Sequence, residues 1–189
     1  MLREPAAAAV LALLAALLLH MTVFRDKKRT LAALLFGVYL AVMLAVTGFP
    51  RLPHVTFDPD RNLIPFYNVK TYLLSAFLNI VMFVPLGFLL PFFWAFFRKC
   101  GRTLAAGLFL TVFIETAQLF THRFTDINDV ITNLLGAAAG YLLARLFTKG
   151  FTKRTLPGTK TGDPVWMFLA VTVLFFTALT PFLNLTARL

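Results

Sequence analysis

Apolar stretches long enough to cross a lipid bilayer recur along the whole of this 189-residue chain. A spanning helix needs about 20 predominantly apolar residues. A chain with 59% hydrophobic residues and a mean hydropathy of +0.81 is not a typical soluble domain. Because lipid offers no partners to backbone polar groups, each stretch is expected to be a helix. We predict an all-α, polytopic single membrane domain over 1–189, with six spans at 5–24, 30–49, 72–97, 103–120, 130–147 and 165–183.

Lysine and arginine are distributed unequally between the two ends of these spans. Twelve of the 18 lie in or beside the first, third and fifth loops, and 6 lie on the other side. The richer side is expected to be cytoplasmic, which places both termini and the loops at 50–71 and 121–129 outside the cell. The long, proline-rich loop at 50–71 is expected to lie along the outer interface. Basic residues in short loops fit anionic lipid headgroups, so membrane lipids are the expected partners and nucleic acid is not.

Polar side chains are concentrated in and beside the third, fourth and fifth spans. Thr111, Glu115 and Gln118 follow helical spacing and share one face of the fourth span. A carboxylate at membrane depth costs several kcal/mol, so it needs a partner or a task. We predict an outward-facing polar pocket between these three spans, covered by the 50–71 loop.

The residue types in this cluster suggest two roles. Glu115, Asp129 and Asp126 are candidates for general acid–base catalysis. The remaining members are candidates for substrate binding, and the arginines among them suit a phosphate or a carboxylate. They are Arg61, Asn62, Asn79, Gln118, Arg123 and Asn133. No cofactor is predicted, and the single cysteine, Cys100, excludes an internal disulfide.

Each of these residues also has a structural interpretation. Glu115 is a possible ion-pair partner of Arg123 or Arg61, and the two aspartates stand where N-terminal caps of a helix are expected. The asparagines suit hydrogen bonds between helices, and the GxxxG pattern at 136–140 suits close helix packing. A divalent cation bound by Glu115, Asp126, Asp129 and His122 is a further option, although their spacing matches no metal motif.

Several short segments together resemble the VanZ family of bacterial membrane proteins. They occur in the family's order over about 60–145, whereas 5–24, 30–49 and 165–183 lie largely outside the resemblance. One departure is Asn133-Leu-Leu-Gly, where the family often has Asn-Thr-Leu-Gly. The segments are Arg61-Asn-Leu-Ile-Pro-Phe66, Asn79-Ile-Val-Met-Phe-Val-Pro-Leu-Gly87, Glu115-Thr-Ala-Gln118, Arg123 to Asp126, and Asp129-Val-Ile-Thr-Asn133-Leu-Leu-Gly136.

This resemblance implies a bacterial plasma membrane and a role at its outer face. The family's name-giving member confers resistance to teicoplanin, a glycopeptide antibiotic that carries a fatty acyl chain. The leading expectation is therefore lowered susceptibility to lipoglycopeptides, by binding or acting on an amphiphile at the outer leaflet: the antibiotic, a lipid or a lipid-linked wall precursor. The alternatives are a membrane enzyme that modifies a lipid or a lipid-linked precursor through Glu115 and Asp129, and a non-catalytic structural or partner-binding protein.

Overall fold

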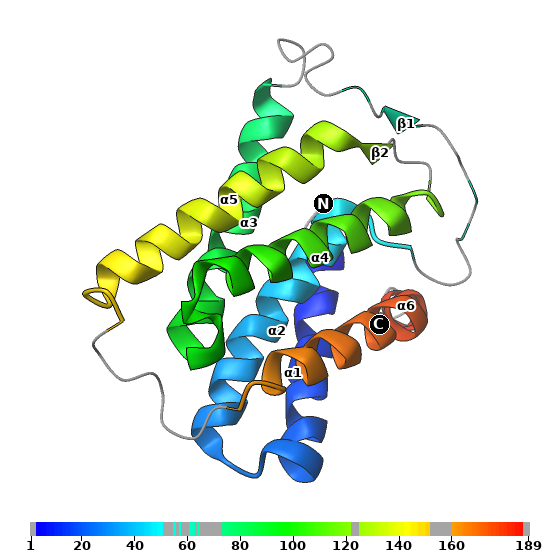
Figure 1. Cartoon of the computed structure of the whole chain (residues 1–189). Helices are drawn as coiled ribbons and strands as arrows, with labels where there is room; N and C mark the ends of the chain where they lie inside the picture. The colour runs from blue at the N-terminus through cyan, green and yellow to red at the C-terminus, as the bar shows by residue number, and fades with distance from the viewer. Residues whose placement is uncertain are drawn as a thin grey trace. The chain divides into compact units, whose positions relative to one another are not determined.

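The computed structural model describes residues 3–50, 55, 57, 61–62, 64, 73–121, 125–151 and 160–186. Within these residues, six helices are long and apolar enough to cross a membrane (Figure 1), which confirms the predicted all-α polytopic fold. They are α1 (Arg3–Leu19, extended by the π-helical turn η1, His20–Phe24), α2 (Lys27–Thr47), α3 (Leu73–Phe93), α4 (Cys100–Gln118), α5 (Ile127–Phe147) and α6 (Asp163–Thr186). Two short strands, β1 (Arg61–Asn62) and β2 (Thr125–Asp126), pair in parallel.

The chain packs as two compact units. Unit 1, Met1–Thr56 with Leu156–Leu189, contains α1, η1, α2 and α6. Unit 2, Phe57–Thr155, contains α3, α4, α5, both strands and the 3-10 helix η3 (Ala95–Arg98). The motif-bearing segment at 60–145 therefore lies entirely in unit 2. That the units act as one membrane domain stays a prediction.

Aspartate caps explain why two helices begin earlier than the predicted spans. α2 begins at Lys27 because the Asp26 carboxylate accepts the backbone N–H of Arg29 at 2.9 Å. α5 begins at Ile127 because the Asp126 carboxylate accepts the backbone N–H of Asn128 at 2.9 Å. Such a cap satisfies a backbone donor that has no partner within the helix. A hydrophobicity pattern does not register polar first turns, so the predicted spans start too late.

The third span ends earlier than predicted. The apolar sequence continues to Phe97, but α3 ends at Phe93, and Trp94 has an extended backbone with φ −119° and ψ 117°. The 3-10 helix η3 follows. Trp94 is itself buried, with its ring centroid 5.6 Å from that of Phe93. The residues therefore stay apolar across the point where the helix ends and the backbone becomes extended.

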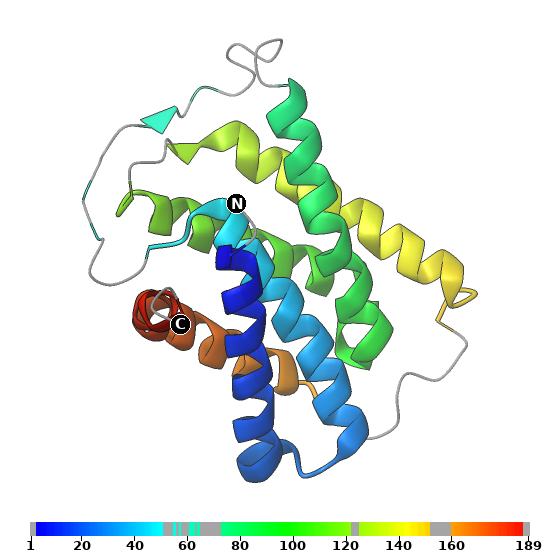
Figure 2. The same ribbon diagram turned by 180° about the vertical axis from the view of Figure 1, so that it is seen from behind.

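Small side chains bring the helices of unit 1 together. Figures 1 and 2 show α1 and α2 side by side, joined at Arg25 and Asp26. Alanines line the buried faces of both helices, where small side chains allow close approach. The fully buried alanines are Ala8, Ala12, Ala15 and Ala16 on α1 and Ala32, Ala33 and Ala41 on α2. α6 packs against both helices, and its Met167 side chain lies against Gly37.

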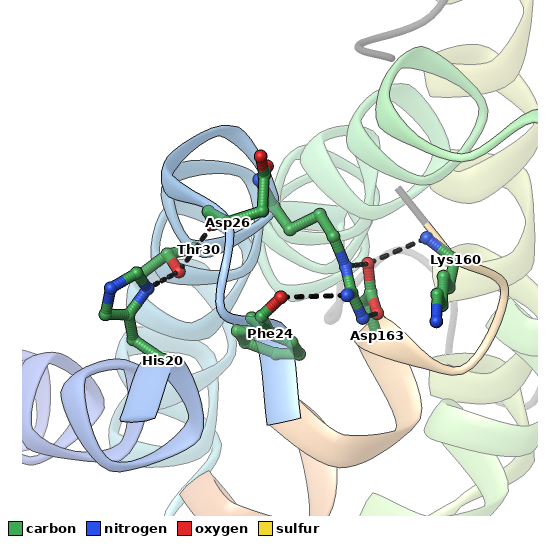
Figure 3. A network of polar contacts seen from close by, with 7 residues as sticks. His20, Phe24, Asp26, Thr30, Lys160 and Asp163 are labelled. Carbon is green, nitrogen blue, oxygen red and sulfur yellow. Dashed lines mark hydrogen bonds and ion pairs between the residues drawn. The ribbon is translucent and has the colours of Figure 1, made fainter. Parts of the chain in front are cut away.

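A buried ion pair ties α6 to the α1–α2 hairpin. The Arg29 guanidinium donates to both carboxylate oxygens of Asp163, from Nη2 at 2.6 Å and from Nε at 3.1 Å. Figure 3 shows Phe24 and Lys160 beside Asp163. The Phe24 carbonyl oxygen accepts from Arg29 Nη1 at 2.9 Å, and the Lys160 N–H donates to Asp163 at 2.8 Å. Both charged groups are thus held by several hydrogen bonds.

Glycines form the seam between α3 and α5 in unit 2. A Cβ atom added at Gly136 would collide with the backbone of Ile80, and one at Gly140 with the backbone of Val84. The predicted packing face at 136–140 is therefore real. Because Ile80 lies opposite Gly136 and Val84 opposite Gly140, the two helices run in the same direction (Figure 2).

Candidate functional site

The last two turns of α4 carry the central acidic residue of the site. Thr111, Glu115 and Gln118 are all buried, as their shared helical face predicts. Only 6% of Glu115 is exposed. Apolar side chains are exposed elsewhere around the helix, at Phe109 and Val112, and at Phe120 just beyond its end. The helix thus presents a polar stripe to the protein and an apolar surface to its surroundings.

The Glu115 carboxylate reaches the start of α5. Its Oε2 atom accepts the backbone N–H of Asp126 at 3.1 Å. Asp126, also 6% exposed, uses its own carboxylate to cap α5. Glu115 therefore joins the end of α4 to the start of α5, and the capping interpretation of Asp126 describes what its side chain does here.

Asp129 completes a group of three neighbouring carboxylates. Asp129, in the first turn of α5, lies near both Glu115 and Asp126. Asp129 is half-buried, and the amide of Asn79 on α3 faces its carboxylate. The Asn79 Nδ2 atom is buried and has no hydrogen-bond partner within the described part of the chain. Three helices thus contribute polar side chains at one end of unit 2.

Asn133 lies one turn beyond Asp129 on α5. Its Nδ2 atom donates to the Thr111 hydroxyl of α4 at 2.9 Å. This is the interhelical bond expected of an asparagine inside a membrane protein. The Oδ1 atom of the same amide is buried and has no hydrogen-bond partner among the described residues. Asn133 thus both joins two helices and keeps an unused acceptor.

Two described parts of the 50–71 segment, Phe57 and β1, lie at the same end of unit 2. Strand β1 pairs with β2, with Arg61 opposite Thr125 and Asn62 opposite Asp126. The ring of Phe57 lies 5.8 Å from that of Phe120, just beyond α4. The side chains of Arg61 and Asn62, and all of His122 and Arg123, lie outside the described residues. The predicted ion pairs of Glu115 with these arginines therefore stay predictions.

The clustered side chains of α3, α4 and α5 can accept hydrogen bonds and transfer protons. Carboxylates on α4 and α5, with amides on α3, α4 and α5, provide hydrogen-bond acceptors and proton-transfer groups in apolar surroundings. No group of three His, Cys, Asp or Glu side chains in the described residues has the arrangement of a metal site. The structure brings together five of the predicted site residues, Asn79, Glu115, Asp126, Asp129 and Asn133. Their roles in catalysis or binding stay predictions.

Two features of the site were not predicted from the sequence. Thr111 was placed on the polar face but was given no role, although it anchors Asn133. The spacing of four residues between Thr111 and Glu115 indicates that Thr111 belongs to the same polar face. The pairing of β1 with β2 left no signal, because two residues are too short a run for a strand pattern.

Comparison with known proteins supports the resemblance seen in the sequence motifs. The family profile described as VanZ/LLP1 matches residues 11–148, a segment that begins within α1 and ends just after α5. Searches of curated proteins and of solved structures gave no significant match. The profile covers the greater part of the chain, including the whole of the site. This multi-pass membrane protein therefore belongs to the VanZ family.

Proposed function

We propose that this VanZ-family protein lowers susceptibility to teicoplanin-type lipoglycopeptides by binding or acting on an amphiphile at the outer leaflet. One observation carries the proposal: buried polar side chains from α3, α4 and α5 meet at one end of helices that are otherwise apolar. Intramembrane ionisable residues are expensive to maintain and usually mark a functional site. The exposed apolar residues of α4 offer a surface for an acyl chain.

The placement of this site at the outer face is part of the proposal. It rests on the 12-to-6 distribution of basic residues between the two ends of the spans. Cys100 is exposed at the basic end, so we expect it to resist a membrane-impermeant maleimide in intact cells and to react after lysis. In a Cys100→Ser background, Thr125→Cys should label in intact cells. Labelling of Cys100 in intact cells would invert the topology.

The function itself is tested by drug susceptibility. Expression in a susceptible Gram-positive host should raise the inhibitory concentration of teicoplanin several-fold and that of vancomycin much less, because vancomycin lacks the acyl chain. Glu115→Gln and Asp129→Asn should remove this difference at unchanged protein level, since each deletes a charge at nearly constant volume. Asp26→Asn, which deletes a carboxylate in unit 1 but keeps a good helix cap, is the matched control and should retain it.

Two outcomes would reject this function. Equal protection against both drugs would indicate an effect on their shared peptide target and not on the lipid chain. No protection, with folded protein in the membrane, would reject the resistance role for this protein. A second candidate would then lead, a membrane enzyme that uses Glu115 and Asp129 as acid–base groups on a lipid or a lipid-linked wall precursor. The adjacency of these two carboxylates, from different helices, favours that reaction class.

A further inference from the structure

The end of unit 2 where α4 begins is strongly basic. Lys99 and Arg102 are exposed there and Arg98 is half-exposed; these three residues form the basic corner. Residues 61–114 and 130–155 contain no aspartate or glutamate. In the described part of the chain, neither Lys99 nor Arg102 forms an ion pair. The positive charge of these two side chains is therefore available to an anionic partner from outside the protein.

The Arg102 side chain is held in place by Phe96. The guanidinium carbon lies 4.1 Å from the centroid of the Phe96 ring, and Nη1 donates to the Phe96 carbonyl oxygen at 3.2 Å. Among the described residues this is the one hydrogen bond of the Arg102 side chain. A guanidinium carries five N–H donors in a planar fork that matches a phosphate. Arg102 is thus oriented, and most of its donors remain for an oxyanion.

A strained turn after α5 supports the basic corner. Lys149, Gly150 and Phe151 have left-handed backbones, with φ of 50°, 73° and 66°. This conformation is uncommon for lysine and phenylalanine, and it persists where surrounding contacts hold it, often at functional sites. The Phe151 carbonyl oxygen accepts from Arg98 Nη1 at 3.3 Å, and the Tyr141 hydroxyl donates to the Arg98 carbonyl oxygen at 2.7 Å. The end of α5 therefore fixes the segment that leads into α4.

An aromatic surface lies at the same end of unit 2. Phe92, near the end of α3, and Phe147, at the end of α5, are both exposed. Phe88 lies between them, with its ring centroid 5.3 Å from that of Phe92 and 5.9 Å from that of Phe147. Phe96, beside Arg102, is also exposed. Cations next to exposed aromatic rings, at the ends of membrane-spanning helices, suit a lipid with an anionic headgroup.

We propose that this end of unit 2 binds an anionic phospholipid, with its phosphate at Lys99 and Arg102. An acyl chain of the same lipid lies along Phe92 and Phe147. A zwitterionic lipid is disfavoured, because its own cation meets the basic corner and like charges repel. A soluble phosphate leaves the aromatic surface uncovered. The inference is separate from the proposed function, since Glu115 lies at the other end of α4.

Two lipids that differ only in their headgroups test the proposal. The full chain is immobilised in a maltoside detergent and loaded with radiolabelled dioleoyl phosphatidylglycerol. Unlabelled dioleoyl phosphatidylglycerol, dioleoyl phosphatidylcholine and inorganic phosphate then compete for binding at constant ionic strength. We expect phosphatidylglycerol to compete about tenfold more strongly than phosphatidylcholine, because each basic residue near a headgroup contributes roughly fivefold in affinity. Inorganic phosphate should displace little of the label.

Two double variants with the same change in net charge separate this site from general attraction. Lys99→Gln with Arg102→Gln should weaken phosphatidylglycerol binding about tenfold or more. Lys27→Gln with Lys28→Gln removes two exposed cations from the start of α2 in unit 1 and should leave binding within about twofold. Arg102→Lys keeps the charge but loses the planar fork, so its loss should be intermediate. An unchanged melting temperature shows that the variants fold.

Three outcomes would overturn the proposal. Equal competition by the two lipids would show that the headgroup charge is not recognised. Equal losses in the two double variants would show that binding follows net charge and not the basic corner. Complete displacement by inorganic phosphate would show a phosphate site without a lipid.

Discussion

The two units treat buried polar groups in opposite ways. In unit 1, the Arg29–Asp163 pair is bidentate, and backbone groups of Phe24 and Lys160 complete it. In unit 2, Glu115, Asp126 and Asp129 stand near one another, and the Asn133 oxygen has no partner among the described residues. The Arg29–Asp163 pair is thus complete within the described residues, whereas the Asn133 oxygen is left without a partner there.

This difference separates structural polarity from functional polarity. A closed network such as that of Arg29 holds helices in place and leaves nothing for a ligand to bind. Acidic side chains in apolar surroundings, beside a buried acceptor that no described residue pairs, cost stability, and such costs are tolerated mainly at functional sites. The comparison therefore predicts that stability is most sensitive to polar changes in unit 1, and function to those in unit 2.

The largest expected effect comes from breaking the buried ion pair. Arg29→Met or Asp163→Leu alone should lower the free energy of unfolding by about 3–5 kcal/mol, because each leaves an uncompensated buried charge. The Arg29 and Asp163 side chains are only 9% and 1% exposed. The double variant should be more stable than either single one, since both charges are then removed. Thermal unfolding of the purified protein in detergent measures all three.

The exposed Arg25, which lies between η1 and α2, provides the control. Arg25→Met removes a charge from an exposed side chain and should change the unfolding free energy by less than about 0.5 kcal/mol. If both single variants at the ion pair were equally mild, unit 1 would not depend on its polar network. The contrast between the units would then be lost.

The second effect concerns the glycine seam of unit 2. Gly136→Ala adds a methyl group where the Ile80 backbone lies, and overpacking of this kind costs about 1–3 kcal/mol. Gly101→Ala is the matched control: nothing lies within 4 Å of an added Cβ atom there, and alanine favours a helix by roughly 1 kcal/mol. The two substitutions should therefore shift the melting temperature in opposite directions. A shift in the same direction would show that the helices separate easily.

The sequence was sufficient to predict the membrane-spanning helices and which of their faces are buried. Apolar runs identify a span because lipid requires helices, and spacing of three and four residues placed Thr111, Glu115 and Gln118 together on a face that is buried. The GxxxG pattern identified the seam for a similar reason, since only small residues allow two backbones to approach so closely. These are local rules, which a single sequence can reveal.

These local rules do not predict which residues pair when they lie far apart in the sequence. Arg29 and Asp163 lie 134 residues apart, and Arg29 counted only as a topological charge in a loop. The Asp126 N–H that bonds Glu115 could not be predicted either, because every residue except proline offers such a donor. The end of α3 at Phe93 was missed because the residues that follow are equally apolar. Sequence patterns specify faces and depths, but not which partner on another helix is chosen.

The smallest expected effect on stability tests the link between the two helices of the site. Thr111→Val keeps the shape of a fully buried side chain but removes the hydroxyl that accepts from Asn133 at 2.9 Å. Interhelical hydrogen bonds in membrane proteins average about 0.6 kcal/mol, so unfolding should change by about that amount. Thr132→Val is the control, because among the described residues the Thr132 hydroxyl bonds only the backbone of its own helix. We expect Thr111→Val, and not Thr132→Val, to reduce protection against teicoplanin, because the Asn133 amide loses the anchor that orients its free oxygen. A stability loss at Thr111 as large as that at Arg29 would mean that the polar residues of unit 2 are as structural as those of unit 1.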